Sequence, residues 1–164
     1  MKKQKGFSLI ELLIVVAIIL IIAAIAIPNL LRSKMAANES SAVGSLRSIN
    51  TAEVTYATAY PSVGYSNLLG DLGGTATSCA TAAGATSTNA CLIDNVLATA
   101  TAATSAKSGY YFTYAAGTVA GTSYTVQAPP ATPGTTGQRY FFTDQTGVIR
   151  YGLSSQPDIT SSPL

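Results

Sequence analysis

The chain has 164 residues, of which 48% are hydrophobic and 10% are charged, and it contains no histidine. This length leaves room for one small globular domain beside any membrane segment. Histidine, the commonest general base, is absent, and the acids Asp71, Asp94, Asp144 and Asp158 have no recognisable catalytic spacing, so we expect no enzyme.

The N-terminus joins a basic leader to a long apolar segment. Residues 6–31 read GFSLIELLIVVAIILIIAAIAIPNLL, and Glu11 is the one charged side chain among them. About 20 apolar residues cross a bilayer, so we predict a membrane-spanning helix, with Lys2, Lys3 and Lys5 kept in the cytoplasm. A carboxylate in hydrocarbon costs roughly 2.5 to 3.5 kcal/mol. We therefore expect a partner for Glu11 on another molecule, or an amine that cleavage of the leader exposes.

Three simpler interpretations compete for this segment. An ordinary secretory signal also has a basic start and an apolar stretch, and Ala24-Ile25-Ala26 could serve as its cleavage site. That apolar stretch is typically 7 to 15 residues long, shorter than here. A plain single-span anchor accounts for the length but not for Gly6 and Glu11. A buried helix of a soluble core is disfavoured because no other long apolar segment could cover it.

An amphipathic pattern follows the apolar segment. Apolar and tyrosine residues recur at mostly helical intervals over residues 32–60, so we predict one long helix that leaves the membrane and ends at Tyr60, because Pro61 disfavours helical geometry before it. Pro28 lies within the helix and removes a hydrogen bond. A kink or a locally extended segment at Pro28 is the expectation, against the alternative that a membrane helix tolerates the proline.

Residues 61–107 are rich in Ala, Thr, Ser and Gly and are expected to form a surface loop. The two cysteines, Cys79 and Cys91, lie here, and in an exported domain an isolated pair most simply forms a disulfide. Zinc is the alternative, but two thiols without histidine do not complete a structural site. A short helix is expected at residues 91–98.

Four strand-like runs complete the chain, at residues 109–115, 123–128, 139–143 and 148–153. They predict an antiparallel sheet over residues 108–164, with a tight turn at Gly147. Pro129, Pro130 and Pro133 mark a connection rather than a central strand. The sheet is expected to cover the helix face that carries Leu46, Ile49 and Tyr56, an α+β arrangement in which the tyrosines are core residues.

The motif Lys5-Gly6-Phe7-Ser8-Leu9-Ile10-Glu11-Leu12-Leu13 resembles the class III signal of type IV pilins and type II secretion pseudopilins. The resemblance implies a lollipop-shaped fold, cleavage after Gly6 by a prepilin peptidase, and N-methylation of Phe7. It further implies that Glu11 neutralises the N-terminal amine of a neighbouring subunit, which is plausible because two opposite charges leave water together at lower cost than either alone. In resembling filaments the segment around Pro28 is unwound.

The resemblance predicts a structural subunit of a type IV pilus-like filament. The implied partners are further copies of the chain in a helical homopolymer, the prepilin peptidase, and an inner-membrane assembly platform with its ATPase. The subunit would be stored in the inner membrane with its head in the periplasm, then reach the cell surface in the fibre, where motility and adhesion are family roles. The runner-up is a type II secretion pseudopilin, and a third possibility is a monomeric anchored binding module.

Neither a cofactor nor a nucleic acid is expected. Removal of Lys2, Lys3 and Lys5 leaves six of nine basic side chains against seven acidic ones, a net charge of −1, which suggests no basic surface. Many pseudopilins bind calcium through C-terminal acids, but Asp144 and Asp158 are the acids of this region, so no metal site is predicted.

Overall fold

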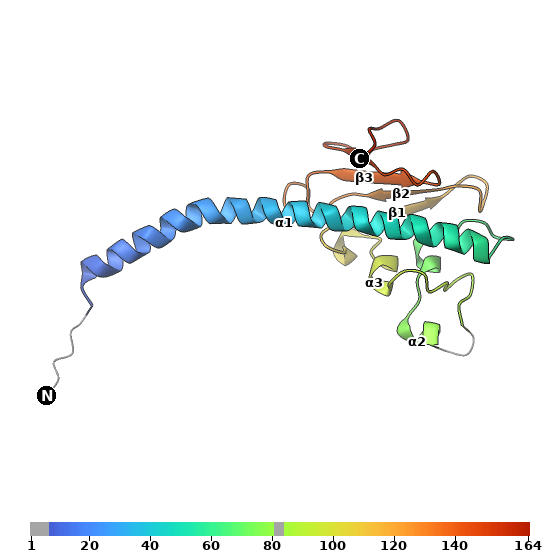
Figure 1. Cartoon of the computed structure of the whole chain (residues 1–164), viewed down its shortest axis with the longest axis horizontal. Helices are drawn as coiled ribbons and strands as arrows, with labels where there is room; N and C mark the ends of the chain where they lie inside the picture. The colour runs from blue at the N-terminus through green and yellow to red at the C-terminus, as the bar shows by residue number, and fades with distance from the viewer. Residues whose placement is uncertain (1–6, 81–83) are drawn as a thin grey trace. The chain divides into compact units, whose positions relative to one another are not determined.

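The computed structural model describes residues 7–80 and 84–164, which divide into two compact units, Met1–Lys34 and Met35–Leu164. Helix α1, Leu9–Ala59, supplies residues to both (Figure 1). The predicted long helix is thus confirmed. It ends one residue before the expected Tyr60, whose N–H still donates to the Tyr56 carbonyl at 2.8 Å.

Pro28 lies inside α1, and the helix is continuous on both sides of it. The locally extended segment that was one expectation here is therefore absent from this structure. A proline removes one backbone hydrogen bond within a helix, so a bend at Pro28 and its unwinding in an assembled fibre stay predictions.

The second unit is an α+β fold in which residues 35–59 of α1 pack on a four-stranded antiparallel sheet (Figure 1). The strand order is β1-β2-β3-β4. The strands are β1 Thr113–Ala116, β2 Tyr124–Ala128, β3 Tyr140–Asp144 and β4 Arg150–Gly152. All four lie within or one residue beyond the predicted runs, which confirms the antiparallel sheet and the fold class.

The two central strands contribute to the core in different ways, since burial alternates along β2 but is continuous from Phe141 to Asp144 in β3. β2 shows the burial pattern expected of a half-buried strand, with Tyr124, Val126 and Ala128 buried. From α1 the core receives Leu46 and Ile49, each fully buried, together with Tyr56. The sequence expectation for the buried helix face is therefore confirmed. Tyrosines supply much of the remaining core, including Tyr110 and Tyr124.

Strand β1 begins later than expected, at Thr113 rather than Gly109. The cause is a tight turn in which Lys107 and Tyr110 exchange backbone hydrogen bonds, with Ser108 and Gly109 at positive φ values of 50° and 73°. Such a turn reverses the chain and cannot belong to an extended strand.

The β3–β4 turn and the β2–β3 connection agree with the sequence. Gly147 has φ +74°, and its N–H donates to the Asp144 carbonyl at 2.9 Å, so the positive φ expected of this glycine is confirmed. Pro129, Pro130 and Pro133 all lie between β2 and β3, in the predicted connection.

The segment 61–107 differs from the expected surface loop. It contains the short helices η1 Leu69–Leu72, α2 Ala76–Ala80, α3 Asn95–Ala98 and η2 Ala103–Ser105. Leu69, Leu72 and Leu97 are buried in the core, whereas Leu92 and Val96 are exposed. The expected short helix at residues 91–98 exists only in its C-terminal half, as α3.

Candidate assembly site

The N-terminal end of α1 is built around Glu11. Its Oε2 accepts a hydrogen bond from the backbone N–H of Ser8 at 2.9 Å. Ser8 directly precedes the first helical residue, Leu9, so Glu11 occupies the third helical position, from which an acid satisfies a free N–H of the first turn. Its second oxygen, Oε1, has no hydrogen-bond partner in residues 7–80 and 84–164. Gly6 lies outside the described residues, and Phe7 is 81% exposed.

The rest of the first unit presents an unburied apolar surface. Every Phe, Leu, Ile and Val from Phe7 to Leu31 is between 45% and 81% exposed. Within α1 an 18-residue window reaches a mean hydropathy of 3.3, and none of that window is buried, so α1 has the length and composition to cross a membrane. An exposed apolar surface of this extent needs a lipid or protein partner.

In the second unit an ion pair ties α1 to the sheet. Glu39 Oε2 lies 2.7 Å from Nε of Arg139, and Oε1 accepts hydrogen bonds from the N–H groups of Gln138 and Arg139 at 2.9 Å and 3.2 Å. Burial raises the pKa of Glu39. The bonds from Gln138 and Arg139 and the guanidinium charge lower that pKa by more, so it falls below its ordinary value.

A second acid of α1, Glu53, is fully buried and forms no ion pair with residues 7–80 or 84–164. Its Oε1 lies 2.6 Å from the Ser66 hydroxyl, and its Oε2 accepts from the Ser66 backbone N–H at 3.0 Å. Tyr114 donates its hydroxyl hydrogen to the Ser66 carbonyl at 2.8 Å. Burial first, and then the nearby Glu53 charge, raises the pKa of the Tyr114 phenol, so it stays a neutral donor. This cluster fixes the segment that leaves α1 against β1.

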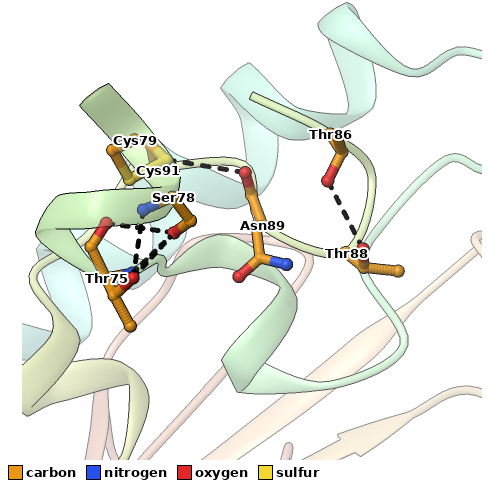
Figure 2. Close-up of a disulfide and its surroundings, with 7 residues drawn as sticks. All are labelled: Thr75, Ser78, Cys79, Thr86, Thr88, Asn89 and Cys91. Carbon is orange, nitrogen blue, oxygen red and sulfur yellow. Dashed lines mark hydrogen bonds between the residues drawn. A yellow bond between two sulfur atoms is a disulfide. The ribbon is translucent and has the colours of Figure 1, made fainter. Parts of the chain in front are cut away.

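The predicted disulfide between Cys79 and Cys91 is present, with Cα atoms 5.9 Å apart (Figure 2). Backbone bonds hold one side of the loop independently, since Cys91 N–H donates to the Gly73 carbonyl at 3.0 Å. The Thr75 and Ser78 hydroxyls are hydrogen-bonded to each other in the turn before Cys79. The cysteines thus close a surface loop rather than bind zinc.

The four scattered aspartates each stabilise a local turn. The side chain of Asp71 accepts from Leu68 N–H, that of Asp94 from Leu97 N–H, and that of Asp158 from Thr160 N–H. Asp144 accepts from Thr146 N–H at 2.9 Å. In the described part of the chain no three His, Cys, Asp or Glu side chains gather as metal ligands. The four aspartates therefore accept hydrogen bonds from backbone N–H groups and stabilise turns.

Sequence reasoning missed Glu39 and did not recognise the role of Glu53. Both occupy positions of the buried helix face, which also carries Leu46 and Ile49. An acid in register with an apolar stripe signals a buried, hydrogen-bonded carboxylate. The partner Arg139 could not have been identified in this way, because it lies 100 residues further along the chain.

Comparison with known proteins finds one matching family and two curated relatives that are similar over part of the chain. Residues 1–27 match the family described as the prokaryotic N-terminal methylation motif. The chain is 60% identical over 40 residues to the type IV wide pilus major component PilA4 of Thermus thermophilus, which covers 24% of this chain and 30% of that protein. It is 46% identical over 54 residues to the type IV major pilin protein PilA of Myxococcus xanthus, or 33% of this chain and 24% of that protein.

The chain therefore spans less than a third of the length of each of these curated relatives. No solved structure matches it. The chain thus carries the N-terminal methylation motif and is similar over part of its length to two type IV pilins, and its long helix packs on an antiparallel sheet.

Proposed function

We propose that the protein is a structural subunit of a type IV pilus-like filament. The observation that carries this proposal is the exposed apolar helix surface from Phe7 to Leu31, interrupted by the single acid Glu11. A bilayer can cover this surface before assembly, and equivalent helices of other subunits can cover it afterwards. The subunit is thus stored in the inner membrane, with its head in the periplasm, and later forms part of an extracellular fibre.

Processing at the Gly6–Phe7 bond supplies the missing partner of Glu11. Cleavage by a prepilin peptidase creates an amine at Phe7, which is then N-methylated. The free Oε1 of Glu11 accepts from the Phe7 ammonium of an adjacent subunit, while Oε2 keeps the Ser8 N–H. Pairing removes the cost of two isolated charges in an apolar fibre core, and it sets the axial position of each subunit.

The helix and the head have separate tasks in this mechanism. The apolar part of α1 supplies cohesion, and Pro28 lets this part lengthen as it leaves the membrane. The head is held on the rest of α1 by Glu39 with Arg139 and by Glu53 with Ser66. An inner-membrane platform and its ATPase add each subunit at the fibre base. In this role the subunit is structural and catalyses no reaction.

The N-terminal residue of the mature chain tests the proposal. Peptide mass spectrometry is applied to the membrane fraction and to filaments sheared from the cell surface. N-methylated Phe7 in the sheared filaments is the expected result. An N-terminus at Ile27 would instead mean an ordinary secreted protein, and an intact Met1 would mean a simple membrane anchor.

A pseudopilin of a type II secretion system is the second candidate, because it shares the N-terminal motif. Fibres that persist on cells lacking only the secretion machinery support the pilus subunit. Loss of secretion without loss of fibres supports the pseudopilin.

A further inference from the structure

Two basic side chains directly follow the apolar part of α1. Arg32 and Lys34 are exposed, and residues 12–31 before them contain no charged side chain. Neither Arg32 nor Lys34 forms an ion pair or a side-chain hydrogen bond with residues 7–80 or 84–164. Two cations therefore lie without a counter-ion at the end of a segment that has the length and composition to cross a membrane.

The chain supplies no nearby acid to pair with these cations. Along the sequence the nearest acids on either side are Glu11 and Glu39. A helix rises about 1.5 Å per residue, so Glu11 lies about 30 Å from Arg32 along α1. Both oxygens of Glu39 are already bonded, Oε2 to the Arg139 side chain and Oε1 to two backbone N–H groups. The counter-ions of Arg32 and Lys34 therefore come from outside the chain.

The two cations lie on different sides of α1. Successive residues of an α-helix are about 100° apart around its axis, so Lys34 is rotated by about 200° from Arg32. An acid of a neighbouring protein that approached from one side would reach only one of them. A layer of lipid headgroups surrounds a membrane helix and offers phosphates on every side. This arrangement favours a lipid surface over a protein as the partner of both cations.

We propose that Arg32 and Lys34 bind the phosphates of anionic lipids in the periplasmic leaflet and thereby fix the depth of α1 in the membrane before assembly. Long basic side chains at the end of a membrane helix extend to the headgroups while their apolar stems stay beside the hydrocarbon. Each basic residue close to an anionic lipid surface strengthens the attachment. The proposal deepens the membrane storage step of the proposed function and rests on it.

This anchor determines where Glu11 lies in the stored subunit. The hydrocarbon core is about 30 Å thick, which corresponds to about 20 helical residues. With Arg32 at the periplasmic boundary, the core holds residues 12–31, and Glu11 lies at the cytoplasmic boundary. The carboxylate can keep its bond from Ser8 N–H there and remain hydrated, so it avoids the cost of an ion in hydrocarbon. Arg32 and Lys34 thus keep Glu11 hydrated until the subunit is assembled.

Processing changes the distribution of basic side chains across the span. Before cleavage the three lysines of residues 1–6 outnumber Arg32 and Lys34, in agreement with a cytoplasmic N-terminus. Cleavage after Gly6 removes all three lysines. Arg32 and Lys34 are then the basic side chains that remain beside the span, and they hold the chain at the leaflet through which it leaves the membrane.

Lipid binding to the full-length chain tests the anchor. Native mass spectrometry in detergent counts the lipids that the chain retains when phosphatidylglycerol or phosphatidylcholine is added. One basic residue near an anionic surface contributes about fivefold in affinity, so the double variant Arg32→Gln, Lys34→Gln should bind phosphatidylglycerol roughly thirtyfold more weakly. Its phosphatidylcholine binding should not change. Unchanged phosphatidylglycerol binding would overturn the proposal.

A matched control removes the same charge from the head. Arg47 and Lys107 lie in the second unit and form no ion pair with residues 7–80 or 84–164. The variant Arg47→Gln, Lys107→Gln should keep the phosphatidylglycerol affinity of the unchanged chain. An equal loss of affinity in this control would mean that net charge, not the position of Arg32 and Lys34, determines lipid binding, and it would overturn the anchor.

The depth of α1 gives an independent measurement. The chain contains no tryptophan, so Leu12→Trp supplies a single fluorophore next to Glu11. In nanodiscs that contain phosphatidylglycerol, quenching by brominated lipids should place this tryptophan near the membrane surface. When Arg32→Gln and Lys34→Gln are added, the quenching should shift towards the bilayer centre, because the apolar Leu9 and Ile10 then draw the helix inward. An unshifted depth would reject the role of the anchor.

Fibre formation distinguishes the anchor from the alternatives. Methylated filaments together with phosphatidylglycerol binding that the double substitution leaves unchanged would reject the anchor and leave the filament function intact. Weakened lipid binding of the double variant, in a chain that never forms fibres, would support the anchor and reject that function. Loss of fibres with unchanged lipid binding and depth would mean that Arg32 and Lys34 pair with another protein, and it would overturn the proposal.

Discussion

Glu53 lies fully buried against Ser66, with its Oε1 2.6 Å from the Ser66 hydroxyl and its Oε2 3.0 Å from the Ser66 backbone nitrogen. No cation shares this contact among the described residues. A single residue of the segment after α1 thus satisfies both oxygens of a buried carboxylate, and the head depends on that segment staying in place.

Ser66→Ala should destabilise the head by about 2 kcal/mol, because a hydrogen bond to a charged group contributes roughly 1.5 to 3 kcal/mol. The backbone N–H bond to Glu53 persists, so the head should still fold. Thermal unfolding of the full-length chain in detergent measures the change. Ser48→Ala is the control, since Ser48 is exposed and bonds only within α1. Equal stabilities of the two variants would contradict this role of Ser66.

Acid should weaken the contact between Glu39 and Arg139. The pKa of Glu39 is lowered in the folded chain, so the stabilisation is complete above the unfolded value of about 4.5 and is lost as the pH falls through the lower folded value. Glu39→Gln should be less stable than the unchanged chain at pH 7, and the difference should shrink below about pH 4.5. Urea unfolding at a series of pH values measures it. Ser48→Ala serves as the control and should keep the original pH dependence, because Ser48 carries no titratable group and bonds only within α1.

Gly74→Ala should disturb the disulfide. A Cβ at Gly74 would lie 2.5 Å from the Sγ of Cys79 and 2.8 Å from that of Cys91, closer than real Cβ atoms come. We expect a loss of about 1 to 3 kcal/mol, typical of overpacking. Gly70→Ala is the matched control, because nothing lies within 4 Å of its added Cβ.

A double-mutant cycle identifies the cause of that loss. In a chain that also carries Cys79→Ser and Cys91→Ser, the sulfurs are replaced by smaller oxygens, and Gly74→Ala should cost less. An undiminished cost in this background would place the strain elsewhere in the loop.

The sequence predicted the elements that depend on local chemistry. Pro61 indicated the end of α1 to within one residue, and Gly147 indicated a turn that needs positive φ. Residues 61–107 were the weakest prediction because their short helices are stabilised by distant contacts: Leu72 is buried in the common core, and the Ala90 N–H donates to the Asp71 carbonyl. Periodicity cannot reveal contacts of this kind.

At the N-terminus, the sequence indicated that Glu11 is exceptional but not that it also caps α1. The charge of this carboxylate within an apolar segment predicts a partner on another molecule or at an amine exposed by cleavage. The bond from Ser8 N–H adds a second, local role in the isolated chain. Two substitutions can separate the two roles.

Glu11→Gln should fail to assemble even though it keeps the cap. The Gln carbonyl can still accept from Ser8 N–H, but it carries no charge to neutralise the Phe7 ammonium of a neighbour. Loss of the pairing by about 1.4 kcal/mol or more per subunit reduces each addition roughly tenfold. We expect normal amounts of chain in the membrane and little sheared fibre. Glu11→Val should give the same fibre loss and should also fray the first turn of α1, which hydrogen exchange of Ser8 in detergent detects. Normal fibre yield from Glu11→Gln would mean that capping, not charge, is the contribution of Glu11 to assembly.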